Sequence, residues 1–332
     1  MLTAKLPRVH IAHLPTPLEA LSRLTAQQDG PELWIKRDDQ TGLATGGNKA
    51  RKLEFLIADA LAQDGGCDTL ITCGAAQSNH ARQTAAAAAR FGLACWLVLR
   101  GEPPPQLSGN LLLDHLLGAR IVWAGSRSLS DEAAQVAARL RAEGRRPYII
   151  PYGGSNPVGA AGYVAAMEEL LAQCEAHRLY FDHIVLASSS GGTQAGLMVA
   201  ARALRHTGQI VGISVDLRSE TLRRTLSELA TATAKLLGLA ESFTPQDFYV
   251  VDDYLGGGYG VVGELEREAI LTLARAEGIL LDPVYTGRAF GGMLDMIRRG
   301  VFGRGERVLF WHTGGTAGIF GYTDQLATIQ AD

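Results

Sequence analysis

The chain has 332 residues, of which 47% are hydrophobic and 20% are charged, and its formal net charge is −3. A chain of this length can bury a large core, and we expect it to form two domains. The small negative charge leaves no basic surface for nucleic acid, and no apolar run approaches membrane-spanning length. The four cysteines lack the paired spacing of a zinc site and the start of the chain lacks a secretion signal, so we expect buried free thiols, no metal and a soluble, cytoplasmic protein.

Along the chain, short apolar runs alternate with amphipathic segments. After a proline-punctuated start with a short helix near Leu18–Thr25, strands are expected at Leu33–Lys36, Thr69–Cys73, Ala94–Leu99, Ile121–Trp123, Tyr148–Ile150, His183–Ala187, Ile210–Val215, Phe248–Val251 and Arg307–Trp311. Helices are expected at Asn79–Arg90, Asn110–Leu117, Ser130–Glu143 with Ser130 as the cap, Pro157–Cys174, Gln194–His206, Thr221–Leu237, Gly263–Glu277 and Arg288–Arg299. This alternation predicts an α/β fold with two doubly wound parallel sheets and a site in the cleft between them.

One lysine, Lys49, has unusual neighbours. It follows two glycines, which permit tight backbone turns, and Asn48, which is a favoured helix N-cap. Apolar residues then recur at helical spacing, so Lys49 should begin a helix. The helix dipole and the nearby charges of Arg51 and Lys52 favour the neutral amine, which carbonyl chemistry requires. A solvated surface lysine is the alternative, and the local pattern does not decide between the two.

A turn of small residues leaves the strand at 183–187 and enters a helix. Successive backbone N–H groups, hydroxyls and a helix N-terminus make a cradle for an anion such as a phosphate monoester. Neither a Walker pattern nor a GxGxxG after a strand is present, so ATP and NAD are not favoured. An ordinary strand–helix turn is the alternative. The turn consists of Ser188, Ser189, Ser190, Gly191, Gly192 and Thr193.

Polar residues also follow three other predicted strand or strand-like ends, where parallel sheets bind ligands. Gln77, Ser78 and Asn79 precede a helix, and capping explains only one of them; the others could bind a cofactor oxygen and a substrate carboxylate. Tyr285 faces a predicted turn, and Thr313 follows the last strand. Core packing of the tyrosine and simple capping by the threonine are the alternatives.

Five segments together resemble one family of enzymes. The segments 46–54, 77–80, 153–156, 282–285 and 312–315 are similar to pyridoxal-phosphate (PLP) enzymes of the tryptophan-synthase-β fold. The similarity is greatest to the branch holding 1-aminocyclopropane-1-carboxylate (ACC) deaminase, D-cysteine desulfhydrase and L-cysteate sulfo-lyase. It implies a large domain of residues 1–49 and 156–332, an inserted small domain of residues 50–155, and a homodimer.

The resemblance also implies roles for the candidate residues. Lys49 would hold PLP covalently and remove the substrate's α-proton, and the turn 188–193 would bind the phosphate. Asn79 would meet the ring oxygen and, with Gln77 and Ser78, the substrate carboxylate. Thr313 would face the pyridine nitrogen, and Tyr285 would hold or protonate the leaving group.

Two positions favour one activity within this branch. The deaminases carry an acidic residue where this chain has Thr286, and leucine where it has Thr313. A hydroxyl cannot protonate the ring as a carboxylate can, and the weaker electron sink that results suffices for β-elimination. We therefore predict a PLP-dependent carbon–sulfur lyase. The segments 11–19 and 109–116 resemble the sulfo-lyases and the triplet 285–287 resembles the desulfhydrases. Of the two we predict a D-cysteine desulfhydrase that releases sulfide, pyruvate and ammonia.

Three alternatives are kept. An L-cysteate sulfo-lyase would need a cation for the sulfonate, for which Arg218 and Arg288 are the candidates. An ACC deaminase is less favoured, and a non-catalytic PLP- or amino-acid-binding protein would lack turnover. One departure from the family pattern bears on the cofactor: Ser189 stands where glycine is usual, and it can offer its N–H only if its φ need not be positive.

Overall fold

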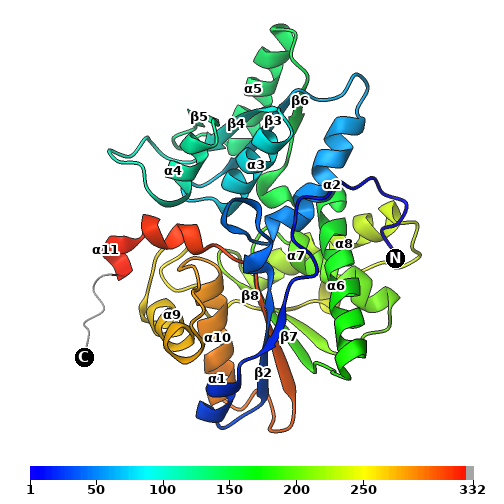
Figure 1. The fold of residues 1–332 in the computed structure, drawn as a ribbon, viewed down its shortest axis with the longest axis vertical. Helices are drawn as coiled ribbons and strands as arrows, with labels where there is room; N and C mark the ends of the chain where they lie inside the picture. Colours follow the sequence, from blue (N-terminus) through cyan, green and yellow to red (C-terminus); the bar gives the residue numbers. More distant parts are fainter. Residues whose placement is uncertain (327–332) are drawn as a thin grey trace.

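The computed structural model describes residues 1–326 and consists of two lobes, each built on a parallel sheet (Figure 1). The predicted α/β class is confirmed. Within the described residues, no helix is long and apolar enough to cross a membrane.

The sheet of the larger lobe has six strands, in the order β1-β2-β10-β7-β8-β9. All neighbours are parallel except β1, which pairs antiparallel with β2 at one edge. The central strands are apolar runs because both of their faces are covered. The strands are β1 (Leu18–Ala20), β2 (Glu32–Arg37), β7 (His183–Ser188), β8 (Gln209–Ser214), β9 (Tyr249–Val251) and β10 (Arg307–His312).

The sheet of the smaller lobe has four parallel strands in the order β5-β4-β3-β6. They are β3 (Thr69–Gly74), β4 (Ala94–Leu99), β5 (Arg120–Trp123) and β6 (Pro147–Ile149). All four come from the part of the chain between β2 and β7, so the smaller lobe is an insertion in the larger one. The domain limits at 49/50 and 155/156 stay a prediction; the first falls one residue inside a helix.

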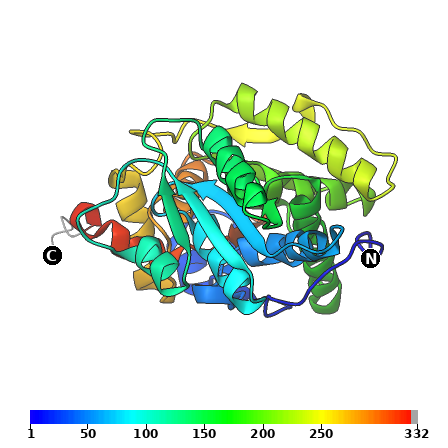
Figure 2. The same cartoon turned by 90° about the horizontal axis from the view of Figure 1, so that it is seen from above.

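Helices cover both faces of both sheets, as a doubly wound fold requires. In the larger lobe, one core lies under α6 (Pro157–His177), α7 (Gly192–Ala203) and α8 (Ser219–Leu236), and the opposite core lies under α1 (Ser22–Gln27), α9 (Glu264–Glu277) and α10 (Thr286–Arg298). In the smaller lobe, α2 (Lys49–Ala62), α3 (Asn79–Arg90) and α4 (Gly109–Leu116) cover one face and α5 (Leu129–Ala142) the other, as the view from above shows (Figure 2).

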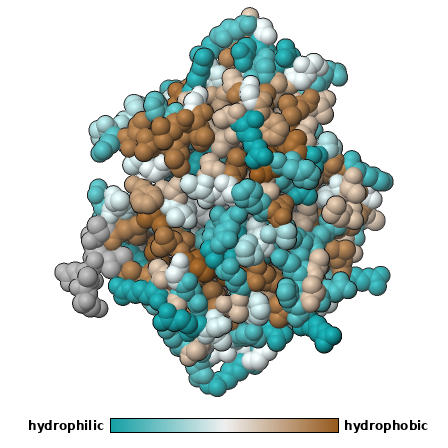
Figure 3. Space-filling model, viewed as in Figure 1, coloured by the Kyte–Doolittle hydropathy of each residue, from teal (hydrophilic) through white to brown (hydrophobic). Residues whose placement is uncertain are grey.

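The remaining elements are short. They are the 3-10 turns η1 (Asp38–Gln40), η2 (Leu43–Thr45), η3 (Tyr152–Gly154), η4 (Pro245–Asp247) and η5 (Thr316–Gly321), and the last helix α11 (Thr323–Leu326). All four cysteines are buried and free, as predicted. On the face shown in Figure 3, apolar side chains gather over α4, where Leu112 and Leu116 are exposed.

Two local predictions are wrong. The predicted helix near Leu18–Thr25 is strand β1 followed by α1, because Leu18–Ala20 pairs with β2 and this tertiary pairing overrides local propensity. Helix α5 is capped by Ser128, whose hydroxyl accepts from the Asp131 N–H at 3.4 Å, and Ser130 lies inside the helix.

Candidate active site

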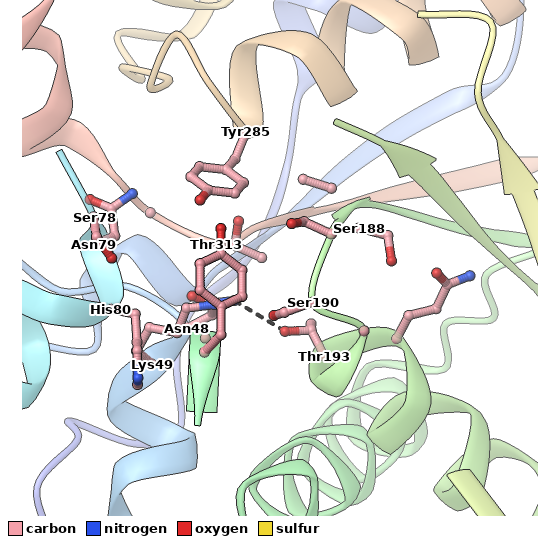
Figure 4. A pocket seen from close by; sticks show the side chains of 17 residues that line it. Asn48, Lys49, Ser78, Asn79, His80, Ser188, Ser190, Thr193, Tyr285 and Thr313 are labelled. Carbon is pink, nitrogen blue, oxygen red and sulfur yellow. Dashed lines mark hydrogen bonds between the residues drawn. The ribbon is translucent and has the colours of Figure 1, made fainter. Parts of the chain in front are cut away.

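A pocket lies where the two lobes meet, at the carboxyl ends of β2, β7 and β10 and the N-termini of α2, α3 and α7 (Figure 4). Strand β10 lies between β2 and β7, so segments far apart in the sequence deliver their loops to one place. The predicted site residues that line the pocket are Lys49, Ser78, Asn79, Ser188, Ser189, Ser190, Gly191, Thr193, Tyr285 and Thr313.

The loop before Lys49 is held in place by backbone contacts. Gly47 has φ 125°, and a Cβ on it would lie 2.6 Å from Gln83 Nε2, so this position requires glycine. The Thr41 hydroxyl donates to Gly47 O and accepts from Gly47 N–H, both at 2.8 Å. The Asn48 N–H donates to Thr313 O at 2.9 Å, which ties the start of α2 to the end of β10.

Asn48 does not act as the predicted helix cap. It stands at the N-cap position, but its backbone is already helical and its side chain makes no capping bond. Instead, Asn48 Nδ2 donates to Thr193 Oγ1 at 3.1 Å, as the dashed line in Figure 4 marks. This bond brings the residue before Lys49 against the small-residue turn, 145 residues further along the chain.

Burial lowers the pKa of Lys49 to about 8. The amine lies beside His80 (Figure 4), whose pKa is held well below its ordinary value by burial and by the charges of Lys49 and Lys52. His80 Nε2 shares a hydrogen bond with Thr72 Oγ1 at 2.9 Å, so the imidazole is a neutral, anchored neighbour. A substantial fraction of Lys49 is therefore the free amine near neutral pH.

Arg51 does not act on Lys49 as an unbalanced charge. Its guanidinium donates to Asp38 at 2.8 and 2.9 Å and to Glu169 at 2.9 Å, and it is fully buried. The Asp38 carboxylate also accepts from Tyr163 OH at 2.6 Å and Trp311 Nε1 at 2.8 Å. This paired network fixes the first turn of α2, and with it Lys49, against the larger lobe.

The turn after β7 has the geometry of an anion cradle. Gly191 adopts φ 86° at the N-cap of α7, which turns the chain so that the helix begins at Gly192. Ser155 braces the turn: its Oγ accepts from Gly192 N–H at 3.1 Å and lies 2.8 Å from Ser190 Oγ. The buried Lys52 side chain donates to the same Ser155 Oγ at 3.0 Å, and burial together with the charge of Lys49 holds the pKa of Lys52 well below its ordinary value.

The residues of the turn fit a phosphate group. Among the described residues, the buried Ser188 Oγ has no hydrogen-bond partner, although it lines the pocket. An anion there would satisfy it. Ser189 is not among the non-glycine residues with positive φ in the described chain, so its N–H can face the cradle as glycine's would.

The start of α3 presents donors to the opposite side of the pocket. Ser78 is the N-cap, and its Oγ accepts from Ala81 N–H at 3.1 Å, which leaves the hydroxyl proton for a ligand. Asn79 Oδ1 accepts from Asn110 Nδ2 at 2.9 Å, which turns the amide so that its own N–H₂ is available. Gln77 does not line the pocket: its side chain accepts from Asn110 N–H at 2.8 Å and donates to Ser108 O at 3.0 Å.

Phenol groups close the third side. Tyr285 OH lies 2.6 Å from Tyr259 OH, and their rings meet edge to face. Burial, with the neighbouring Tyr259 and Tyr152, raises the pKa of Tyr285 well above its ordinary value. These phenols therefore stay neutral and can donate hydrogen bonds.

The two threonines that bear on the activity lie differently. Thr313 lines the pocket. Thr286 is fully buried outside it, and its hydroxyl donates to Asp282 Oδ1 at 2.7 Å. Asp282 also accepts from the N–H groups of Val284, Tyr285 and Thr286, which begins α10 and sets the direction of Tyr285.

Sequence reasoning missed several residues of this site. Tyr152 and Gly153 line the pocket from η3, and Lys52 and Ser155 brace the cradle. Tyr259 lies in the segment after the glycines 256–258, where clustered glycines are typical of a close backbone approach. Gly192, predicted as part of the phosphate turn, does not line the pocket, and its N–H donates to Ser155 Oγ.

The comparisons with known proteins agree with this geometry. A family model described as pyridoxal-phosphate dependent enzyme matches residues 9–314. The chain is 44% identical over 329 residues to D-cysteine desulfhydrase of Yersinia enterocolitica, with 97% of this chain and 98% of the relative covered. It is 43% identical over 328 residues to a Pyrococcus abyssi protein provisionally named 1-aminocyclopropane-1-carboxylate deaminase, with 98% and 96% covered.

A solved structure of a homologue of ACC deaminase superposes with a TM-score of 0.90 and 42% identity, covering 99% of this chain and 98% of the other. These matches confirm the resemblance and the fold. They also confirm the predicted cofactor, because the family is PLP-dependent. The chain belongs to the pyridoxal-phosphate-dependent enzymes.

Proposed function

We propose that this enzyme is a D-cysteine desulfhydrase, which eliminates sulfide from D-cysteine and releases pyruvate and ammonia. The observation that carries the proposal is the character of the pocket lining: a low-pKa lysine, hydroxyls, amides and neutral phenols. The described lining residues include no carboxylate, and Lys49 is the one among them that can carry a positive charge, because His80 is neutral. Such a lining suits a small amino acid whose leaving group is a thiol.

The cofactor, when bound, supplies an electron-withdrawing ring that weakens the bonds at the α-carbon of the attached amino acid. We place its phosphate on the turn Ser188–Thr193, its ring oxygen toward Asn79 and its pyridine nitrogen toward Thr313. Lys49 would hold the cofactor and would serve as the base for the substrate's α-proton. A pKa of about 8 matches this role, because a general base works best when its pKa lies near the operating pH.

The start of α3 binds the substrate carboxylate. The Ser78 hydroxyl and the Asn79 amide have donors left over, and the N-terminal end of the helix favours a negative charge. The role predicted for Gln77 becomes indirect: it fixes Asn110, which in turn orients Asn79.

Tyr285 faces the leaving group. A neutral phenol can donate a hydrogen bond to sulfur as the Cβ–S bond breaks, and its partner Tyr259 can donate to Tyr285 OH through their shared hydrogen bond of 2.6 Å.

The same lining disfavours the two rival substrates. L-cysteate carries a permanent sulfonate charge, yet neither candidate cation lines the pocket: Arg288 is buried against Glu266 at 2.6 Å, and Arg218 is exposed beside Asp252. ACC ring opening demands a stronger electron sink, and no carboxylate lines the pocket among the described residues. Thr286, bonded to Asp282, lies outside the pocket, so the contrast predicted at that position does not bear on the ring.

The test is to give the purified enzyme D-cysteine, L-cysteate and ACC in parallel and to assay sulfide, sulfite, pyruvate and ammonia. We expect sulfide with equal pyruvate from D-cysteine. Sulfite from L-cysteate, or ammonia from ACC alone, would replace the proposal with the corresponding rival. Bound cofactor without turnover of any amino acid would indicate a binding protein. Lys49→Ala should abolish turnover, whereas Lys235→Ala, at an exposed lysine on α8, should not change it.

We further propose that the enzyme is a cytoplasmic homodimer. Its four cysteines are free, which suits a reducing compartment. The exposed Leu112, Leu116 and Phe320 offer apolar surface for a second copy. Light scattering coupled to size exclusion would give twice the chain mass if this is right, and the chain mass if it is wrong.

A further inference from the structure

A carboxylate lies directly behind the cradle. Ser189, whose side chain departs from the glycine usual at this position, donates its hydroxyl proton to Asp216 Oδ2 at 2.7 Å. Asp216 follows strand β8, the neighbour of β7, so the two loops meet at the same edge of the sheet. Within the described residues, the other oxygen, Asp216 Oδ1, is buried and has no hydrogen-bond partner.

An ionised Asp216 weakens the binding of a phosphate that the rest of the turn fits. A hydroxyl has a single proton, and Ser189 donates it to Asp216. The Ser189 oxygen can therefore offer only lone pairs to a ligand in the cradle. An ionised carboxylate one hydrogen bond away from a dianionic phosphate is also repelled by it. Both penalties disappear if Asp216 takes up a proton.

The surroundings of Asp216 allow that protonation. Burial raises the pKa of Asp216 above its ordinary value, while Ser189, the Leu217 N–H and the Arg288 charge act in the opposite direction. Arg288 forms an ion pair with Glu266 and donates to Val215 O at 2.8 Å, so its charge is balanced by Glu266 and not by Asp216. On the pocket side, the group that faces Asp216 is the Tyr152 phenol, which is neutral.

We propose that Asp216 becomes protonated when a phosphate ester occupies the turn, and that this proton reverses its hydrogen bond with Ser189. The proton comes from solvent and stays on the carboxyl group. The Asp216 O–H then donates to Ser189 Oγ, and the Ser189 hydroxyl donates to the phosphate. Asp216 is thus a positioning residue that couples cofactor binding to proton uptake, an inference that rests on the placement of the phosphate in the proposed function.

The proposal predicts a pH-dependent affinity. Between the pKa of Asp216 in the free protein and its higher value in the complex, binding takes up close to one proton, and the affinity falls about tenfold for each rise of one pH unit. Asp216→Asn mimics the protonated acid, because its amide can donate to Ser189 at every pH. It should bind without this uptake.

The test uses the full-length chain freed of cofactor, with pyridoxine 5'-phosphate as the probe, because it has no aldehyde to react with Lys49. Calorimetry in buffers of different ionisation heat, from pH 5.5 to 8.5, counts the protons taken up, and the difference from Asp216→Asn cancels the titration of the probe. We expect a difference that approaches one proton. Equal proton counts in the two proteins at every pH would overturn the proposal.

Two further measurements keep the outcome clear. Ser189→Ala should bind the probe less tightly than the wild type at pH 6, where the wild-type hydroxyl donates to the phosphate; equal affinity would contradict the relay. In the holoenzyme, the ³¹P resonance of the cofactor should titrate at alkaline pH in the wild type and stay constant in Asp216→Asn. If the wild type failed to bind the probe at all, the placement of the phosphate would fall as well, whereas binding with equal proton counts would overturn only the role of Asp216.

Discussion

Lowering the pH should slow the covalent attachment of PLP to Lys49 in a way that an ordinary lysine would not show. Only the neutral amine can attack an aldehyde. Because burial lowers the pKa of Lys49 to about 8, the attachment rate should follow the free amine of a group that titrates there. The start of α2 is fixed by the Asp38–Arg51 pair, so this environment should persist in the protein without cofactor.

The magnitude follows from the fraction of free amine. With a pKa near 8, about 1% of Lys49 is neutral at pH 6, about half at pH 8 and about 90% at pH 9. The rate should therefore rise about fiftyfold between pH 6 and pH 8 and less than about twofold beyond that. A lysine of ordinary pKa near 10.5 would instead gain about tenfold for each unit through pH 9.

The assay is stopped-flow absorbance of the bound cofactor after mixing cofactor-free protein with PLP at saturating concentration. Saturation removes any effect of pH on phosphate affinity. Lys49→Arg is the control and should show no attachment. A rate that keeps climbing tenfold per unit from pH 8 to pH 10 would show that the pocket does not lower the pKa of Lys49, and would refute the reasoning.

Three further predictions concern the surroundings of the site. Arg51→Met should cost about 3–5 kcal/mol in the free energy of unfolding by denaturant, because Asp38 is left buried without its charge partner; a loss below about 1 kcal/mol would contradict this. Tyr285→Phe should keep the cofactor absorbance but lower kcat by about a hundredfold or more, and an unchanged kcat would remove the phenol from the reaction. Gly192→Ala should weaken PLP binding by about tenfold, because the new Cβ would lie 2.7 Å from Ser155 Oγ and 3.1 Å from Ser155 Cβ and would displace the side chain that supports the turn. Gly303→Ala, whose Cβ would lie 3.4 Å from the nearest side-chain atom, is its control, and equal affinities in the two variants would refute the packing argument.

The regular part of this fold could be predicted because its signals are local. Parallel strands that are buried on both faces are apolar runs, so the sequence predicts the central strands within a residue or two of their bounds, as with the predicted strand His183–Ala187 and the observed β7, His183–Ser188. Strand β1 could not be found, because only its pairing with β2 makes it a strand.

The residues of the candidate site likewise fall into those with a local sequence signal and those without one. Lys49 and the turn 188–193 can be identified from the sequence, because glycines and polar residues lie there next to a predicted strand and helix. Lys52 and Tyr259 cannot, because their relevance depends on partners about 100 and 26 residues away, Ser155 and Tyr285. Asn48 shows the limit of a local rule. It has the residue type and position of a helix cap, yet its side chain donates a hydrogen bond to Thr193 and makes no capping bond.

The most direct measurement is to locate the lysine that carries the cofactor. Reduction of the purified holoenzyme with borohydride makes the bond permanent, and mass spectrometry of the digested protein then identifies the modified peptide. The account predicts a single pyridoxyl phosphate group on Lys49. Modification of Lys52 instead, or of no lysine, would contradict it.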